Sequence, residues 1–478
     1  MNEGDAAPRM LGRLFDRACV PTKMRARLNR TAESLHKNPQ RSLPQALGGA
    51  GYKGLMRALR NPRVPQAELL NAVYAATVER IGLRQEVLCI EDTTDLIFGG
   101  PRGRKGLPRL ESKATGFRAH IALCAGLENH DVLGVLDLEQ IVRKDESKAG
   151  QSDIERYNDP NKESLRWQRT VDRTEARTQA RARLIHVRDR EADDYAQLCD
   201  LVQKGRRFVQ RMRQARVLSD APEHAPDARK IDDAMRTLTG ICEREVHLSP
   251  RAQSKFDPRP HGTRKLHPAR LGRPARLSFR ACTLQVKRPA NAPRTLPPAL
   301  SLNVVNVLEL DVPDGADAIE WFLLTSEPID TVEQVERIVD IYRGRWLIEE
   351  FNKALQTGCQ FEKLQMESAD RLWTMLAFYC PIATDLLAMR ALAHKAADTP
   401  ADAVLHPDEL DVLRAERPRL RTKPLTVQSA LLAIAALGGH FSSNGPPGWL
   451  VLLRGMVTLR ERAHGWRLAK QPPTRGPP

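Results

Sequence analysis

Two short apolar segments, each leading into acidic residues, constrain the fold of this 478-residue chain more than any other feature. Residues 87–90 (Val-Leu-Cys-Ile) precede Asp92, and residues 184–187 (Leu-Ile-His-Val) precede Asp189. Runs of this length and composition are typical of strands buried on both faces of a sheet. Carboxylates at strand ends of an α/β fold lie at the edge where sites form. The pattern therefore predicts an α/β domain with Asp92 and Asp189 at a functional edge.

The segments that follow continue the α/β rhythm to about residue 215 and then depart from it. Further strands are predicted at residues 121–124, 132–136 and 208–211. One helix is predicted at residues 160–180, and a second follows residue 193 and ends at about residue 204. Residues 216–320 carry β-rich, partly alternating patterns, which predict a β-rich insertion. Within it, residues 251–280 hold nine lysines or arginines and one acid, so this loop is either a nucleic-acid contact or a solvated linker. Residues 319–325 predict one more strand.

Both ends of the chain are predicted to be helical. The segment at residues 23–30 has four cations and no acid. Such a unit suits contact with a DNA backbone, and the alternative is a plain helical bundle with solvated arginines. The cations proposed for this contact are Lys23, Arg25, Arg27, Arg57 and Arg60.

The charge balance favours a polyanionic partner. The chain has 75 Lys and Arg against 59 Asp and Glu, a net charge of +16. An excess of this size points most often to nucleic acid. The alternative is an arginine-rich proteome encoded by a GC-rich genome.

The cysteines and apolar segments indicate a cytoplasmic protein. The eight cysteines are scattered without a C-x-x-C pair, which argues for a reducing cytosol and against a zinc ribbon or a disulfide framework. The first residues lack the order of a signal peptide. No run of eighteen apolar residues occurs, so no transmembrane helix and no membrane partner is expected.

The segment after residue 330 carries the strongest helix signals. Thr331 is the predicted N-cap, with a glutamine three residues later, and Gly358 is the predicted end. Tyr342, Arg345 and Glu349 are spaced by three and four residues, so they share one helix face. A phenol, a guanidinium and a carboxylate form a coherent set for phosphoryl transfer. The alternative is an ordinary ion pair between residues one turn apart.

Asp92, Asp189 and Glu349 are the candidate catalytic residues and metal ligands. Three carboxylates can hold Mg²⁺, a hard ion that prefers oxygen ligands. Two such ions can activate an attacking water or hydroxyl and stabilise the leaving oxygen. The alternative for each acid is a surface charge or a helix cap.

Four motifs occur in one order along the chain. They are residues 90–94 (IEDTT), 189–193 (DREAD), 321–328 (WFLLTSEP) and 341–351 (IYRGRWLIEEF). Together they resemble the insertion-sequence-four family of bacterial DDE transposases, over almost the whole chain. The family motif reads Y-x-x-R-x-x-x-E-x-x-x-x-x-x-K.

The resemblance implies roles for residues outside the acidic triad. Tyr342 and Arg345 resemble the residues that grip the transposon end. Arg211 resembles a DNA-contacting arginine near the active site, and Trp321 resembles a tryptophan that stacks on a flipped base. The alternative for Trp321 is a strand residue packed in a core.

One departure from the motif concerns the cation after the glutamate. The motif has lysine seven residues after the glutamate, where this chain has Gln356. Lys353, four residues after Glu349, is predicted on the same helix face and is the candidate replacement.

The resemblance also implies a fold, a reaction and partners. The expected core is ribonuclease H-like at residues 81–360, with the insertion at about 216–320. A helical DNA-binding domain at 1–80 precedes it, and a helical dimerisation domain at 361–478 follows. The implied triad is Asp92, Asp189 and Glu349 with two Mg²⁺, for which Mn²⁺ substitutes.

The implied reaction is cut-and-paste transposition of an insertion sequence. Its steps are hydrolysis at the element end, hairpin formation, hairpin opening and strand transfer. The partners are double-stranded DNA, at the transposon ends and the target, and a second copy of the chain in a synaptic homodimer. The expected location is the bacterial cytoplasm, at the nucleoid. The alternatives are a metal-dependent nuclease and a catalytically impaired DNA-binding relic.

Overall fold

The computed structural model describes most of the chain. The described residues are 12–37, 39–99, 104–110, 114–141, 152, 155, 157, 159, 162–179, 181–248, 272–395, 397–417, 424–441, 443 and 445–470. Residues 251–271 of the predicted basic loop and the C-terminal tail at 471–478 lie outside them. The expectation of a loop is wrong for residues 273–280, which belong to a strand that pairs with its neighbours on both sides.

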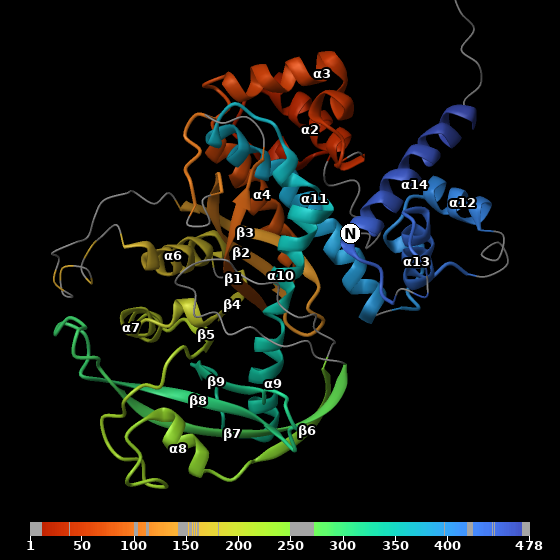
Figure 1. Cartoon of the computed structure of the whole chain (residues 1–478). Coiled ribbons are helices and arrows are strands. Elements are labelled where there is room, and N and C mark those ends of the chain that lie inside the picture. The colour runs from red at the N-terminus through yellow and green to blue at the C-terminus, as the bar shows by residue number, and fades with distance from the viewer. Residues whose placement is uncertain are drawn as a thin grey trace, which may run out of the picture.

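A nine-stranded mixed sheet runs through the middle of the molecule (Figure 1). The strand order is β3-β2-β1-β4-β5-β9-β8-β7-β6. The strands are β1 (Glu86–Ile97), β2 (Gly116–Gly126), β3 (Val132–Ile141), β4 (Arg183–Arg188), β5 (Arg207–Arg211), β6 (Cys242–Leu248), β7 (Arg273–Lys287), β8 (Ala299–Leu310) and β9 (Glu320–Thr325). Each strand predicted from the sequence is present, which confirms a mixed α/β fold.

The first half of the sheet combines antiparallel and parallel pairs. β1, β2 and β3 form an antiparallel meander, whereas β4 pairs in parallel with β1, and β5 in parallel with β4. The expectation that Asp92 follows the end of its strand is wrong, because β1 continues to Ile97 and pairs with β2 over its whole length from Val87. β-Branched residues such as Thr93 and Thr94 favour this extension.

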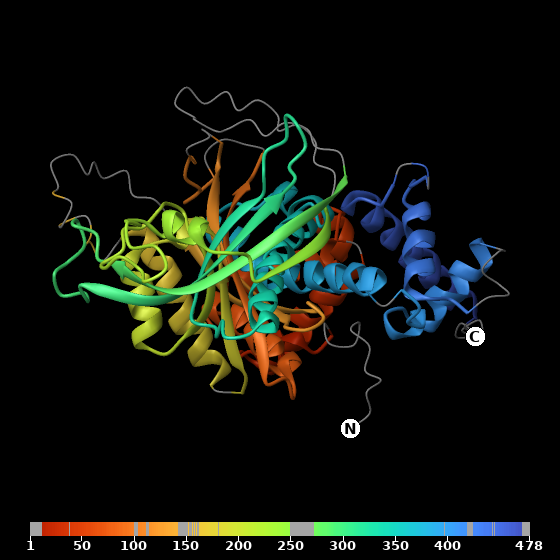
Figure 2. The ribbon, with the colours of Figure 1, turned by 90° about the horizontal axis from the view of Figure 1, so that it is seen from below.

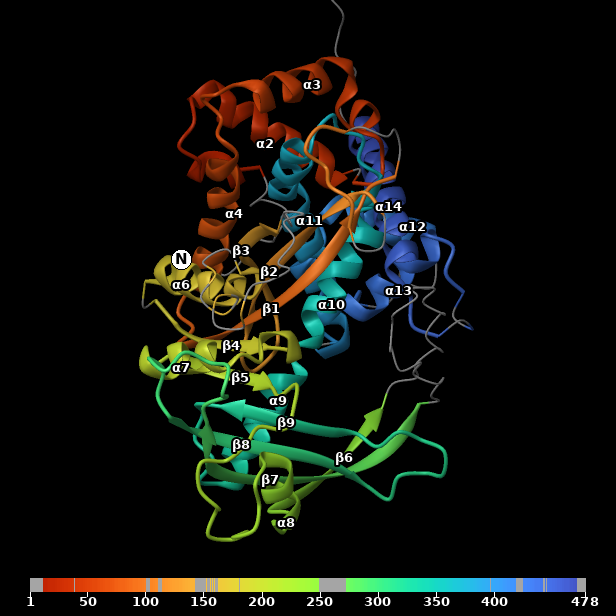
Figure 3. The same cartoon turned by 60° about the vertical axis from the view of Figure 1, so that its left-hand side comes forward.

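The β-rich insertion extends the same sheet. β9 pairs antiparallel to β5, and β8, β7 and β6 follow as further antiparallel strands. The helix α8 (Ile231–Thr237) packs against β7. Figure 3 shows this half of the sheet below β5, continuous with the strands that carry the acidic motifs. The insertion therefore forms an extension of the core sheet.

Helices cover both faces of the sheet. The N-terminal ones are η1 (Leu14–Arg17), α2 (Thr22–Lys37), α3 (Leu43–Arg60) and α4 (Gln66–Ile81). On the same side, α4 and α11 (Ala369–Lys395) pack against β3. On the other side, α6 (Arg166–Thr178), which follows η2 (Glu163–Leu165), contacts β2 and β3, and α7 (Tyr195–Gln203) contacts β5.

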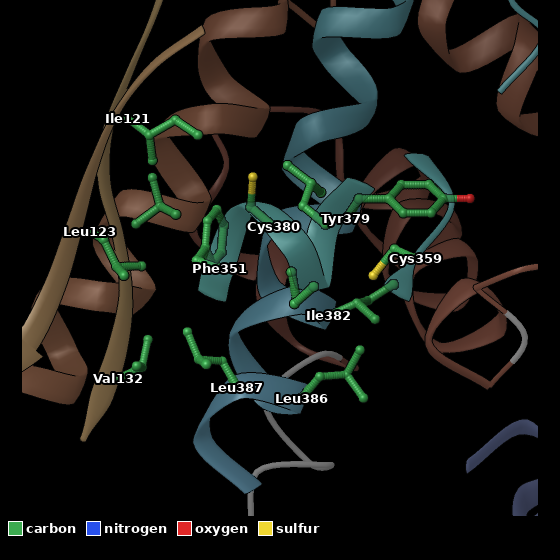
Figure 4. Close-up of a cluster of buried hydrophobic side chains, with 14 of the residues drawn as sticks. Ile121, Leu123, Val132, Phe351, Cys359, Tyr379, Cys380, Ile382, Leu386 and Leu387 are labelled. Carbon is green, nitrogen blue, oxygen red and sulfur yellow. The ribbon is translucent and has the colours of Figure 1, made fainter. Parts of the chain in front are cut away.

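The largest hydrophobic core lies between α11 and the sheet. Figure 4 shows Cys380, Ile382 and Leu387 of α11 with Ile121 and Leu123 of β2. All five side chains are buried to 97% or more. By length and composition alone, residues Ala369–Arg390 of α11 could cross a membrane. In this fold 89% of that apolar stretch is buried inside the protein, as in a core helix.

The C-terminal helices lie to one side of the sheet (Figure 2). They are η6 (Ala401–Ala403), α12 (Pro407–Glu416), α13 (Val427–Leu437) and α14 (Trp449–Lys470). The short helix η5 (Phe361–Lys363) lies instead against β1, where Glu362 accepts a hydrogen bond from the Ile97 N–H. The buried side chains of the C-terminal helices join one apolar cluster that also holds residues of α2, β2 and α11. The N-terminal, central and C-terminal segments thus share a core, and the predicted domain boundaries remain a prediction.

The helix predicted from Thr331 to Gly358 is divided into three pieces. They are α9 (Val332–Arg343), α10 (Trp346–Lys353) and a π-helical turn, η4 (Ala354–Gly358). Thr331 and Gln334 form the predicted capping box. At Gly344 the backbone changes to hydrogen bonds between residues three apart. A Cβ there would lie 3.0 Å from His130 Nε2, so a glycine suits this close approach.

Candidate active site

Asp92 and Asp189 lie on adjacent parallel strands. Ile90 on β1 is paired with Val187 on β4, so each aspartate lies two residues beyond the same register position. Asp189 caps the short helix η3 (Arg190–Ala192), where its Oδ1 accepts a hydrogen bond of 2.8 Å from the backbone N–H of Glu191. The parallel pairing therefore places Asp92 and Asp189 at the same level of the sheet, next to the carboxyl end of β4.

The electrostatics show that the two acids interact. Burial and the negative charge of Asp189 raise the pKa of Asp92 to about 7 from its ordinary value of 3.8. The guanidinium of Arg345 and a hydrogen bond of 2.7 Å from the Thr93 N–H act in the opposite direction. Burial first, and the charge of Asp189 second, thus disfavour the ionised form of Asp92.

Arg345 joins the sheet to the helix that carries Glu349. Its Nη1 lies 3.3 Å from Asp92 Oδ2, and its Nη2 donates a hydrogen bond to Glu349 Oε1. Figure 3 shows α10 beside β1. Despite burial, which lowers it, the pKa of Arg345 is raised by the neighbouring negative groups. Arg345 therefore joins two of the three acids predicted from the sequence, Asp92 and Glu349.

Tyr342, Trp321 and Arg211 form a cluster beside these acids. The rings of Trp321 and Tyr342 meet edge to face with centroids 5.3 Å apart. The Arg211 guanidinium lies 5.7 Å from the Trp321 ring, within the range of a cation–π contact. Burial lowers the pKa of Arg211, as do the charges of Arg190 and Arg345. The structure thus brings together three of the predicted DNA contacts, Tyr342, Trp321 and Arg211.

Lys353 and Gln356 have different surroundings from one another. Lys353 Nζ donates a hydrogen bond of 2.9 Å to Glu350 and lies 4.6 Å from the Trp346 ring centroid. Gln356 lies in the π-helical turn, where Nε2 donates to Thr94 Oγ1 at 2.9 Å and to the Asp95 carbonyl at 3.2 Å. Gln356 is thus fixed to β1 near Asp92, and Lys353 is paired on another part of the helix.

The predicted N-terminal cations lie on α2 and α3. Lys23, Arg57 and Arg60 are exposed, while Arg25 and Arg27 are half-buried. Arg60 contacts Glu367 at 3.4 Å, and Arg25 donates to the Val20 carbonyl. These contacts leave Lys23 and Arg57 without an ion-pair partner in the described part of the chain.

A buried polar network under the site was missed by the sequence analysis. Glu91 is fully buried, and its Oε1 is 2.7 Å from His186 Nδ1. The other nitrogen of His186 contacts Glu175 at 3.2 Å. Although burial alone would raise it, the pKa of Glu91 is held at about 2 by His120 and His186. Acidic and imidazole side chains inside apolar strand segments were the available signal.

Thr93 links this network to the candidate acids. His120 Nδ1 lies 2.8 Å from Thr93 Oγ1, which also accepts a hydrogen bond of 3.1 Å from Arg166 Nε. Arg166 in turn donates to Glu191 at 2.8 Å, in the turn that begins with Asp189. Arg166 therefore links Thr93, next to Asp92, to Glu191, two residues after Asp189.

Two groups of side chains bear on metal binding. Cys89, Glu91 and His186 offer ligand atoms within 4.8 Å of one another. Both ring nitrogens of His186 already face carboxylates, which accounts for this group as an ionic network. The set of Asp92, Asp189 and Glu349 fits a divalent cation better, because it offers hard oxygen ligands. A cation there would also offset the effects of burial and of Asp189, which disfavour the ionised form of Asp92.

Comparison with known proteins identifies the family. The transposase DDE domain matches residues 141–382, slightly more than half of the chain. The chain belongs to this family and is a DNA transposase of the DDE class. The match includes Asp189 and Glu349 and begins after Asp92.

A solved structure similar to the chain is the piggyBac transposase synaptic complex with hairpin DNA, determined by cryo-electron microscopy. The similarity covers 99% of this chain and 74% of that chain, with 11% identity and a TM-score of 0.32. A likeness this distant does not bear on the fold or function of this chain.

Proposed function

We propose that this protein is a cut-and-paste transposase of the insertion-sequence-four family, similar to the transposase of transposon five. The observation that carries the proposal is the position of Arg345 between Asp92 and Glu349, with Asp189 close enough to raise the pKa of Asp92. This arrangement brings together the acids of three separate motifs. The proposed core is ribonuclease H-like, and the order β3-β2-β1-β4-β5 with β4 and β5 parallel to β1 supports it.

The proposed chemistry is in-line displacement at phosphorus. Asp92, Asp189 and Glu349 would hold two Mg²⁺ ions, which supply activation of the attacking oxygen and stabilisation of the leaving one. The side chains of Tyr342 and Arg345 orient the phosphodiester against these acids. Since every step displaces an oxygen from phosphorus, one site can serve hydrolysis, hairpin formation, hairpin opening and strand transfer.

The aromatic cluster supports the proposed handling of the cut strand. Trp321 offers a ring on which a base can stack, an interaction worth about 1–3 kcal/mol. Arg211 and Tyr342 lie against that ring, so they are placed to bind the phosphate of the same nucleotide. The exposed cations of α2 and α3 would contact the DNA end, and the C-terminal helices would form the homodimer in a bacterial, nucleoid-associated complex.

Substituting Gln356 by lysine is expected to tighten binding of the cleaved end and raise the rate of joining about fivefold. An ammonium group can donate to Thr94 and the Asp95 carbonyl as the amide does, and adds a charge for the phosphate. Charge-assisted hydrogen bonds are about 1 kcal/mol stronger than neutral ones. The measurement is single-turnover joining of a precut end.

Lys353→Ala is the matched comparison for this prediction. Because Lys353 is paired with Glu350, its removal is expected to change joining less than twofold. A large loss in Lys353→Ala with no gain in Gln356→Lys would show that Lys353 supplies the cation.

The proposed function is tested on a donor plasmid carrying the inverted repeats that flank the gene. We expect Mg²⁺-dependent excision and insertion into a target plasmid. Cutting without joining would identify a nuclease, and binding without cutting a DNA-binding relic. Either outcome would contradict cut-and-paste transposition.

A further inference from the structure

An arginine-lined pocket adjoins the candidate active site. Its volume is about 180 Å³, several times that of a water molecule. The lining comes from the turn after β4, the segment after β5, α8 and β9. The lining residues that the argument uses are Arg190, Arg211, Arg213, Arg236 and Glu320.

The pocket carries more positive charge than its own acids compensate. Arg236 is paired with Glu320 at 3.2 Å and with Asp232 at 3.7 Å, and these are the two acids of the lining. In the described part of the chain, Arg190 and Arg213 have no ion-pair partner. Arg211 has no carboxylate partner there either, and its buried Nε has no hydrogen-bond partner.

The position of the pocket relates this charge to the cleavage site. Arg190 directly follows Asp189, so one wall of the pocket belongs to the turn that carries a catalytic acid. Arg211 forms another part of the wall and contacts the Trp321 ring. A DNA strand passing the acids would thus reach the pocket with the nucleotides next to the cut.

We propose that this pocket binds a backbone phosphate of the DNA strand, next to the phosphate that is cut. The inference rests on the proposed function, and it adds Arg190 and Arg213 as phosphate ligands. Guanidinium groups match phosphate oxygens in charge and in bidentate geometry. The arginine side chains of the pocket repel one another, and an anion bound between them removes that repulsion. The pocket therefore favours a phosphodiester over a neutral ligand.

The test compares Arg213→Gln with Arg181→Gln on a duplex carrying the element end. Arg213 is exposed, and only its backbone N–H is used, in a bond to Asp193. Arg181 is also exposed and without an ion-pair partner among the described residues, but it lies between α6 and β4, at the opposite end of β4 from Asp189. Losing one phosphate contact lowers the magnitude of the slope of log affinity against log salt by about 0.9. We expect that decrease for Arg213→Gln and an unchanged slope for Arg181→Gln.

A phosphate scan locates the contact. Single neutral methylphosphonates are placed along the strand, and binding is measured for the full chain and for Arg213→Gln. We expect a methylphosphonate at one position beside the cut to weaken binding of the unmodified protein, and to weaken binding of Arg213→Gln less, as coupling between the two groups requires. Equal losses in both proteins at every position would overturn the proposal.

Two further outcomes are distinguished by the same assay. One outcome is that inorganic phosphate, added at constant ionic strength, weakens DNA binding of the unmodified protein to the level of Arg213→Gln. If in addition no methylphosphonate position distinguishes the two proteins, the pocket binds free phosphate and the proposal fails. If the full chain neither binds nor cuts the end, the proposed function fails. Normal cutting with an unchanged Arg213→Gln slope contradicts the pocket alone.

Discussion

Replacing Asp92 by asparagine is expected to lower the rate of DNA cleavage by about a thousandfold or more while DNA-end binding stays nearly unchanged. The substitution keeps the side-chain shape and removes a charge that a metal ion requires. Stabilisation by a metal ion amounts to several kcal/mol, and about 4 kcal/mol corresponds to a thousandfold in rate. Asp189→Asn and Glu349→Gln are expected to have the same effect in a single-turnover cleavage assay with Mg²⁺.

The control is Asp95→Asn, on the same strand. Asp95 binds Arg118 Nε at 2.9 Å and lies three residues beyond Asp92. Its substitution is expected to change cleavage by a few-fold at most, since an ion pair of this exposure contributes about 1 kcal/mol or less. Substantial Mg²⁺-dependent nicking by any triad variant would remove that residue from the proposed triad.

Asp92→Asn is also expected to change the thermal stability of the protein. Because the pKa of Asp92 is raised from 3.8 to about 7 in the folded protein, its contribution to stability falls as the pH rises from about 4 through 7. At pH 8 without metal, Asp92→Asn is therefore expected to unfold at a higher temperature than the unmodified protein. Mg²⁺ should raise the melting temperature of the unmodified protein more than that of Asp92→Asn.

Glu91→Gln is expected to lower the free energy of unfolding by about 3 kcal/mol or more. Removing one partner of a buried ion pair costs about 3–5 kcal/mol, since the other charge is left uncompensated. Glu91 and His186 are both fully buried. The pKa of Glu91 is held at about 2 against an ordinary 4.5, so its stabilisation is complete above pH 4.5 and is lost as the pH falls through 2. Urea denaturation at pH 7 measures the whole effect.

Glu79→Gln is the matched control for this loss. Glu79 pairs with Arg17, and its side chain is 49% exposed. Exposed pairs contribute about 1 kcal/mol or less, so a much smaller change is expected. Equal losses in the two variants would show that the buried network contributes no more than a surface pair.

The sequence predicted local structure well where a strong pattern marked it. The capping box at Thr331 and the strands of the insertion are present as expected. The helix after Thr331 was less predictable, because it breaks at Gly344, where His130 from a distant turn would lie 3.0 Å from a Cβ and no local pattern records that approach. The π-helical turn that directs Gln356 toward β1 was likewise not visible in the residue spacing.

By itself the sequence determined the members of the candidate site, because the motif residues and their helical spacing are local properties. The acids at 92, 189 and 349, with Tyr342 and Arg345, were identified from strand ends and helical spacing, whereas Arg211 and Trp321 were identified from the family resemblance. Only the tertiary structure decided how they meet. Asp92 lies within a strand, and Arg345 joins Asp92 to Glu349. Glu91, next to Asp92, is buried and contacts His186 of the neighbouring strand. The physical reason is that strand pairing and helix packing join residues far apart in the chain, which no local pattern records.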